Sequence, residues 1–144
     1  MSESTEASPD GYAPLPRTSP VAAPWQPLYS KPVGSTLFVG LRVRKAHCHG
    51  RGYVHGEVIS ALADNAMGYS VQLTRGPDDC ESTPRGGVTM HLSVDFLGRA
   101  RPGEWLEFQP RVLRVGRTVA FTDCRVEADG KLVARADAVF RFEE

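Results

Sequence analysis

The sequence lacks several features that identify common classes of protein. No apolar run is long enough to span a bilayer, and the first residues lack the basic-then-apolar pattern of a secretory signal. Neither sign of charge is in excess, because 17 basic residues balance 17 acidic ones, so net charge gives no case for a nucleic-acid partner. The three cysteines form no Cys-x-x-Cys pair and are typical of reduced thiols in a cytosol. These absences favour a soluble cytoplasmic protein, and 144 residues predict one domain.

Proline is abundant only near the amino end of the chain. Residues 1–32 hold seven of the eleven prolines, and such a segment cannot maintain a long helix or strand. We therefore predict a partly extended or disordered arm at 1–32, followed by a folded domain at 33–144. Trp25, Leu28 and Tyr29 could dock on that domain as a short amphipathic piece, whereas full disorder is the alternative for residues 1–20.

Residues 58–73 contain strong helix formers and no proline. Their apolar residues leave almost no polar face, which predicts one long helix buried by the rest of the chain. Asp64 and Asn65 interrupt this apolar pattern in the middle of the helix. Because a buried carboxylate costs several kcal/mol, roughly, unless a neighbour compensates it, Asp64 is the best single indication of a functional site.

The rest of the chain predicts strands. Period-two or apolar patterns predict strands at 36–45, 88–96, 104–115, 118–128 and 132–142. An irregular loop at 46–54 and a turn-rich connection at 74–87 flank the helix, and Asp129-Gly130 is a two-residue hairpin signal. A strand, a buried helix and a run of antiparallel strands predict an α+β fold, with one sheet packed on one helix.

One helix can cover only one face of a sheet. In the strand at 118–128, Val119 and Phe121 lie on one face and Cys124 and Val126 on the other. Apolar residues on both faces, together with free sheet edges, favour an oligomer in which sheets or edges meet, with a monomer as the alternative.

The amino end of the helix carries His55, Gly56 and Glu57. Free N–H groups and the helix dipole favour an anion or a polarised carbonyl oxygen there, and Gly56 lets a ligand approach the backbone closely. A carboxylate within reach could attack the carbonyl carbon or activate water. A backbone donor and a carboxylate together would suffice for acyl transfer. However, eight residues at about 3.6 per turn place Gly56 and Asp64 about 80° apart, so they are not expected to serve one ligand within a single chain.

An ordered series of motifs resembles a known family. It begins with His-Cys-His-Gly-Arg-Gly-Tyr-Val-His-Gly-Glu at 47–57 and Ala-Leu-Ala-Asp at 61–64. It continues through Gly-Val-Thr-Met-His-Leu-Ser-Val-Asp-Phe at 87–96, Arg-Pro-Gly-Glu at 101–104, Val-Gly-Arg-Thr-Val-Ala-Phe-Thr at 115–122 and Asp-Gly-Lys-Leu-Val-Ala at 129–134. The series resembles the hotdog-fold acyl-CoA thioesterases, specifically their phenylacetate-pathway (PaaI-like) branch, over about residues 34–142.

The resemblance implies a long helix wrapped by an antiparallel sheet of about five to six strands. It also implies a homodimer, or a dimer of dimers, with two sites at the subunit interface. The implied activity is hydrolysis of an acyl-CoA or aryl-CoA thioester, with coenzyme A as part of the substrate and no other cofactor. Neither a nucleic acid nor a membrane is implied as a partner.

The resemblance also assigns roles to particular residues. Gly56 of one subunit would donate its N–H to the thioester oxygen, and Asp64 of the other would be the nucleophile or general base. Thr89 would help to place the water or the carboxylate. Arg114 and Arg117 would contact the phosphates of coenzyme A. The full set implied for substrate and coenzyme A is His55, Glu57, His91, Phe96, Arg114, Gly116, Arg117, Thr118 and Val119.

Two residues depart from the family pattern, which reads Asn-x-x-Gly-x-x-His-Gly-Gly. His49 stands in place of the Asn, and an imidazole can still orient water or donate to a thioester oxygen, so we count His49 in the catalytic set. Glu57 stands in place of the last Gly. It could crowd the acyl group, act as a second carboxylate, or point outward and favour the amino end of the helix.

Other interpretations remain beside this one. Asp64 could be structural, His55 could brace the loop, and His91 could be surface. Arg99 and Arg101, like the two arginines above, could form a solvated face or bind phosphates. The spacing of His47, Cys48, His49 and His55 matches no common zinc pattern, so we predict no metal site. A hotdog protein that binds acyl-CoA without hydrolysing it is the main functional alternative, and a hotdog dehydratase is a weaker one.

Overall fold

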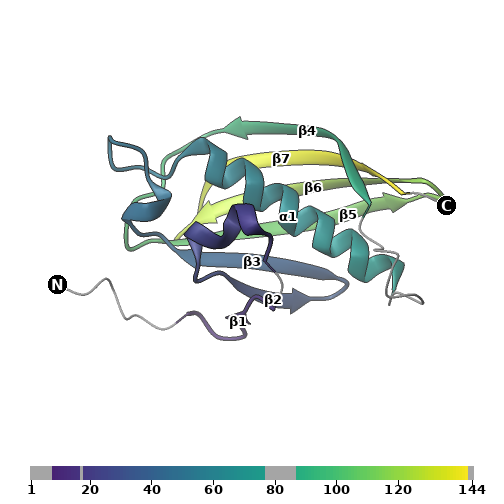
Figure 1. Ribbon diagram of the computed structural model, residues 1–144, viewed down its shortest axis with the longest axis horizontal. Helices are drawn as coiled ribbons and strands as arrows, with labels where there is room; N and C mark the ends of the chain where they lie inside the picture. Colours follow the sequence, from purple (N-terminus) through teal and green to yellow (C-terminus); the bar gives the residue numbers. More distant parts are fainter. Residues whose placement is uncertain (1–7, 17, 77–86, 143–144) are drawn as a thin grey trace.

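The computed structural model describes residues 8–16, 18–76 and 87–142. Within them one long helix, α1 (Gly56–Arg75), lies across one face of a curved antiparallel sheet (Figure 1). The predicted turn-rich connection at 74–87 falls mostly outside the described residues, as do the first seven residues of the arm. The predicted α+β architecture, with one central helix on one antiparallel sheet, is confirmed.

The sheet has seven strands in the order β1-β2-β3-β5-β6-β7-β4. The strands are β1 (Ala13–Pro14), β2 (Tyr29–Val33), β3 (Thr36–Arg42), β4 (Val88–Phe96), β5 (Trp105–Val115), β6 (Val119–Ala128) and β7 (Lys131–Arg141). The helix and strand boundaries predicted for 36–142 lie within three residues of these. Asp129 and Gly130 both have positive φ, as a two-residue hairpin between β6 and β7 requires.

The proline-rich arm accounts for the strands beyond the expected five or six. Its described residues form β1, most of β2 and the short 3-10 helix η1 (Pro20–Trp25), and β2 pairs along its whole length with β3. Pro32 is tolerated in β2, which has only the short β1 on its other side. Leu28 is buried in the core, and Trp25 packs against that core, so this part of the arm docks rather than extending into solvent.

A buried histidine joins the arm to the loop before α1. His47 lies in the 3-10 helix η2 (Lys45–His47), where its Nδ1 accepts from the Arg44 backbone N–H at 3.0 Å. Its Nε2 lies 2.9 Å from the carbonyl oxygen of Trp25. Since Nδ1 is an acceptor, the proton is on Nε2, which donates to that oxygen. His47 therefore fixes the position of the loop that follows it.

The helix is less uniformly apolar than its sequence predicts. Val58, Leu62, Ala66 and Met67 are buried against β3, β5 and β6. A stripe on the opposite side of α1 is only half-buried, and it consists of Ser60, Ala61, Asp64, Asn65, Gly68, Tyr69 and Gln72. The prediction of an almost wholly buried helix is therefore wrong along this stripe, because a single sheet covers only one side of a helix.

Strand β4 forms one edge of the sheet and contains a bulge. Thr89 pairs with Phe140 and His91 with Val139, so Met90 is the extra residue between them. Strict alternation would place Thr89 on the face opposite to Leu92 and Phe96. The bulge reverses this, and Thr89 faces α1 together with Leu92, Val94 and Phe96, while His91 faces away. A one-residue irregularity thus directs the Thr89 hydroxyl toward the helix.

Candidate active site

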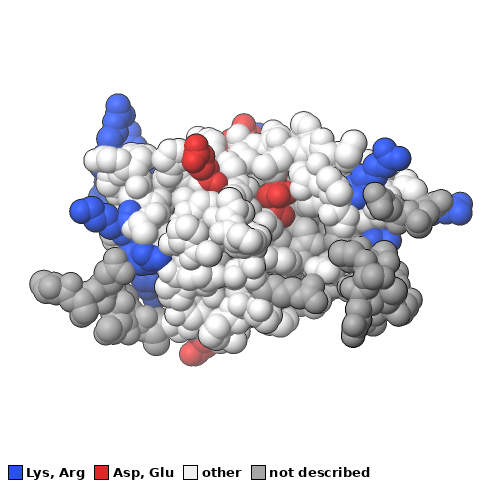
Figure 2. Space-filling model, in the orientation of Figure 1, with Lys and Arg blue, Asp and Glu red and all other residues white. Residues whose placement is uncertain are grey.

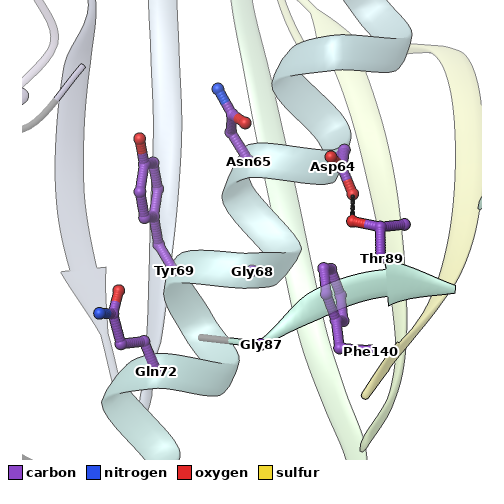
Figure 3. A pocket seen from close by; sticks show the side chains of 8 residues that line it. All are labelled: Asp64, Asn65, Gly68, Tyr69, Gln72, Gly87, Thr89 and Phe140. Atoms are coloured by element: carbon purple, nitrogen blue, oxygen red, sulfur yellow. Dashed lines mark hydrogen bonds between the residues drawn. The ribbon is translucent and has the colours of Figure 1, made fainter. Parts of the chain in front are cut away.

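Asp64 and Thr89 form a polar pair between α1 and β4. The Thr89 Oγ1 donates a hydrogen bond to the Asp64 Oδ1 at 2.8 Å (Figure 3). Burial raises the pKa of the Asp64 carboxyl, and the hydrogen bond from Thr89 opposes this by stabilising the ionised form. The arrangement gives a half-buried carboxylate whose proton affinity exceeds that of an ordinary aspartate, which suits a general base.

A pocket of about 250 Å³ opens beside this pair. It is lined by Asp64, Asn65, Gly68, Tyr69, Gln72, Gly87, Thr89 and Phe140. Gly68 leaves the middle of the helix surface without a side chain, and Phe140 forms an apolar wall from β7 (Figure 3). A ligand in the pocket can therefore reach the Asp64 carboxylate and make both polar and apolar contacts.

The amino end of α1 provides a backbone donor. His55 caps the helix, with its Nδ1 accepting the Glu57 N–H at 3.0 Å and its carbonyl oxygen accepting the Val58 N–H at 3.0 Å. The Gly56 N–H donates to no group among the described residues. The Phe96 ring covers Gly56, since a Cβ placed there would lie 3.1 Å from the Phe96 Cζ. Gly56 thus offers one N–H beside an aromatic ring.

Several roles were predicted for His55 and Glu57, and the structure shows where each residue lies within one chain. His55 braces the loop and caps α1, as described. The Glu57 side chain is exposed to solvent within the chain, on the first turn of the helix, where a negative charge complements the helix dipole. In a single chain Glu57 therefore takes the outward position and does not enter the pocket around Asp64.

His49 lies in the loop ahead of α1 and not in the Asp64 pocket. Its Nδ1 accepts the Arg51 backbone N–H at 3.0 Å, and its ring lies 6.2 Å from that of His55 and 5.9 Å from that of Tyr53. His49 therefore belongs to the same end of the chain as Gly56.

Sequence reasoning considered Arg99 and Arg101 but missed that they cluster with Tyr53 at this end. The guanidinium groups of Arg99 and Arg101 lie 4.9 and 5.6 Å from the centre of the Tyr53 ring. Arg99, and then Arg101, lower the pKa of Tyr53 by favouring its phenolate form. The sequence indicates two arginines in one turn, but nothing in it places a tyrosine 46 residues earlier between them.

The implied coenzyme A contacts are divided between different parts of the fold. Phe96 lies beside Gly56, whereas Arg114, Gly116, Arg117, Thr118 and Val119 lie around the β5–β6 turn at the opposite end of the sheet (Figure 1). His91 lies on the outer face of the sheet, where its Nε2 is 3.7 Å from the Asp137 Oδ1. One chain therefore does not gather the predicted residues around one ligand.

The charges follow the same division. On the face that carries α1, lysine and arginine side chains gather at the two ends, and acidic side chains lie between them (Figure 2). Arg51, Arg99 and Arg101 are exposed near the amino end of α1, and Arg114 and Arg117 near the β5–β6 turn. The chain therefore has two separate basic regions although its net charge is zero.

Three further findings concern metals, thiols and membranes. No group of three or more His, Cys, Asp or Glu residues that could hold a metal ion occurs in the described ranges. Cys48 and Cys124 are free thiols, and Cys80 lies outside the described residues. No helix within the described part of the chain has the length and apolar character needed to cross a membrane.

Comparison with known proteins identifies the family. Residues 51–134 match the family model described as "Thioesterase superfamily". A Pseudomonas aeruginosa protein named "Putative esterase PA0474" is 38% identical over 135 residues, which is 93% of this chain and 96% of that protein. Human "Acyl-coenzyme A thioesterase 13" is 28% identical over 97 residues, or 66% of this chain and 64% of that protein.

A solved structure shows the same fold. The structure titled "Crystal Structure of Hypothetical Thioesterase Protein with Coenzyme A from Streptococcus pneumoniae TIGR4" superimposes with a TM-score of 0.72 at 20% identity, covering 85% of this chain and 90% of that one. The helix on its antiparallel sheet is therefore a hotdog fold. The family-model match over residues 51–134 and the 38% identity to the Pseudomonas aeruginosa protein establish that the chain belongs to the thioesterase superfamily.

Proposed function

We propose that the protein hydrolyses an acyl-CoA or aryl-CoA thioester to the free carboxylate and coenzyme A. The observation that carries this proposal is the Asp64 carboxylate, held by Thr89 at the edge of a pocket and given a raised pKa by burial. Membership of the thioesterase superfamily and the similarity to an acyl-coenzyme A thioesterase support this substrate class. The finer assignment, to the phenylacetate-pathway branch, rests on the motifs around His55 and Asp64.

The proposed reaction uses one water molecule. Asp64 takes a proton from water as the water oxygen bonds to the thioester carbon, and the carbonyl oxygen becomes an oxyanion that accepts the Gly56 N–H. The C–S bond then breaks, and the leaving thiolate takes the proton back, which gives a carboxylic acid and free coenzyme A. In the alternative route Asp64 attacks the carbonyl carbon directly, and water hydrolyses the resulting anhydride.

Two copies of the chain are needed to complete this site. Gly56 and Asp64 are eight residues apart, so they are separated by about 12 Å along the axis of α1. Within one chain Gly56 lies with Phe96, and Asp64 lies with Thr89, at the other end of β4. We propose that the amino end of α1 from one subunit faces the Asp64 pocket of its partner.

The β4 edge supports a dimer with this geometry. Val88, Met90, Leu92 and Phe96 are all exposed in the isolated chain, with Val88 at 64% and Phe96 at 53%. An apolar edge strand is a template for pairing with a second copy. Because antiparallel pairing of two identical β4 strands sets the Phe96 end of one beside the Val88 end of the other, it would bring the two half-sites together. A dimer of such dimers is compatible with the exposed Phe121 on the outer face.

The same pairing would bring the two basic regions together. The cluster of Tyr53, Arg99 and Arg101 from one subunit would approach the β5–β6 turn of the partner, which carries Arg114 and Arg117. Several guanidinium groups at one place suit the phosphates of coenzyme A.

Thiol release tests the proposal. Wild-type protein should release free thiol from acyl-CoA and aryl-CoA substrates, and Asp64→Ala should bind the same thioesters with little or no release. A general base typically contributes about 10²–10⁴-fold to the rate. Saturable binding to the wild type without release above background would instead support the second candidate, a protein that binds acyl-CoA without hydrolysing it. Glu57 and His49, which replace a glycine and an asparagine of the family pattern, favour that candidate.

His49→Asn restores the asparagine of the family pattern. A rise in turnover would show that the histidine weakens the site. A fall would show that the histidine takes part in catalysis.

A further inference from the structure

Beyond Asp64, the pocket contains a row of polar side chains. Asn65, Tyr69 and Gln72 occupy positions i, i+4 and i+7 of α1, which share one face of a helix. All three are half-buried and line the pocket. Figure 3 shows them projecting from one flank of α1, whereas Asp64 points to the other flank, toward Thr89. The row therefore forms a wall of the pocket that is separate from the Asp64–Thr89 pair.

The two amide side chains in this wall have no hydrogen-bond partner among the residues that the structure describes. Neither Asn65 nor Gln72 hydrogen-bonds to any other described residue, although each amide offers two donors and an acceptor. Closing a ligand over such groups without pairing them costs free energy. A site built with polar groups therefore discriminates against a ligand that lacks the matching groups.

The charges that line the pocket restrict which acyl groups it can accept. Within one chain, Asp64 is the only carboxylic acid among the eight lining residues, and none of them is a lysine, arginine or histidine. A second carboxylate in the acyl group would be repelled by Asp64 when that residue is ionised.

We propose that Asn65, Tyr69 and Gln72 select the acyl group, and that the preferred group is uncharged and bears a hydroxyl. This inference rests on the proposed function, because it assigns the acyl part of a thioester to this pocket. A hydroxyl can donate to an amide oxygen or accept from an amide N–H, so it can pair with Asn65 or with Gln72. A plain alkyl chain of the same length would leave the two amides unpaired.

Four-carbon thioesters provide a matched test. Binding of butyryl-CoA, 3-hydroxybutyryl-CoA and 4-hydroxybutyryl-CoA would be measured by calorimetry on full-length Asp64→Asn, so that turnover does not interfere. At least one hydroxy ester should bind about tenfold more tightly than butyryl-CoA, the difference expected for one well-made hydrogen bond. Succinyl-CoA is compared on the wild-type chain with turnover monitored, because Asp64→Asn removes the charge that repels it, and it should bind there more weakly than butyryl-CoA.

Variants of the wall locate the effect. In the same background, Asn65→Leu and Gln72→Leu should bring the ratio of the affinities for the hydroxy ester and for butyryl-CoA toward one. Butyryl-CoA itself should bind at least as well as before. Leu73→Gln is the matched control, because it introduces an amide at the neighbouring, 52% exposed position outside the pocket and should leave the preference unchanged.

The results separate this inference from the proposed function. Equal binding of butyryl-CoA and both hydroxy esters, no binding of any of them, or a preference that survives both leucine variants would overturn the role of the wall. Hydrolysis by the wild type, measured separately, tests the proposed function. Turnover without a hydroxyl preference would support hydrolysis and reject the role of the wall. A hydroxyl preference in binding without turnover would support the role of the wall and reject hydrolysis.

Discussion

At the scale of single residues, Asp64 combines a site for chemistry with a cost to the fold. Its half-buried carboxylate has a raised pKa because ionisation is less favourable there than in water. The Thr89 hydroxyl offsets part of this cost by donating one hydrogen bond. Both properties lead to measurable consequences of substituting these two residues.

Asp64→Asn should make the protein more stable at neutral pH while reducing turnover. The folded-state pKa of Asp64 is raised above its unfolded value, so ionisation favours unfolding. This penalty is absent below the unfolded pKa and complete above the folded one. The gain in Tm from Asp64→Asn should therefore be present at pH 7 and shrink as the pH falls through these values. Thermal unfolding across pH checks this, and an unchanged or lower Tm at pH 7 would contradict it.

Thr89→Val should move the pH dependence of hydrolysis. The hydrogen bond from Thr89 stabilises the ionised form of Asp64, so its removal should raise the pKa of that carboxyl further. If ionised Asp64 is the base, the acidic limb of kcat/KM should shift to higher pH, and the rate at a fixed low pH should fall. Thr89→Ser retains the donor and serves as the control. A limb that stays in place in Thr89→Val would argue against Asp64 as the titrating base.

At the scale of secondary-structure elements, α1 carries both the proposed backbone donor, Gly56, and the proposed base, Asp64. Strand β4 runs beside α1, with Phe96 near Gly56 and Thr89 near Asp64. The backbone geometry at the first residue of α1 allows the Gly56 N–H to be removed by a proline. Gly56 is the first helical residue, and His55 before it is extended, with φ −68° and ψ 137°. Proline is favoured at the first helical position and requires an extended residue before it.

Gly56→Pro should therefore remove the N–H without disrupting α1. The expected result is a fall in kcat of about 10²–10³-fold, the usual effect of losing one oxyanion donor. Gly56→Ala keeps the N–H and adds only a methyl group that the exposed Phe96 ring can accommodate by moving a few tenths of an ångström, so it is the steric control. Circular dichroism would verify the helix. Equal activity of the proline and alanine variants would exclude Gly56 as a donor.

The sequence predicts elements better than it predicts their environment. The apolar periodicity of 58–73 and the alternation of 88–96 are local properties, and both elements formed where expected. Alternation alone, however, places Thr89 beside His91 on the polar face, and only pairing with β7 reveals the bulge at Met90 that turns Thr89 toward Asp64. The cluster of Tyr53 with Arg99 and Arg101 likewise depends on tertiary contacts between distant segments.

At the scale of the whole molecule, three features of the isolated chain fit the proposed dimer. Its apolar β4 edge is exposed, its two basic regions lie at opposite ends, and the two halves of the proposed site are separated by the length of two helical turns. Each of these features would be accounted for by one antiparallel pairing of β4 with its copy.

Leu92→Lys should separate the proposed dimer. Leu92 lies at the middle of β4, where a symmetric pair would place two lysines close together, and like charges facing each other oppose pairing. Light scattering should show a monomer, and hydrolysis should be lost although Asp64 and Thr89 are intact. Phe121→Lys, which alters an exposed residue on the outer face, should retain the dimer and its activity. An active Leu92→Lys monomer would show that one chain suffices.

The separation of Gly56 from Asp64 along α1 has a genetic consequence. If the two groups that act on one substrate come from different polypeptides, two alleles that are each inactive can complement one another. Co-expression of Gly56→Pro with Asp64→Asn would yield hybrids in about half of the assemblies, each with one crevice carrying both lesions and one carrying neither. Activity should then recover to about a quarter of the wild-type level, whereas each mutant expressed alone should remain nearly inactive.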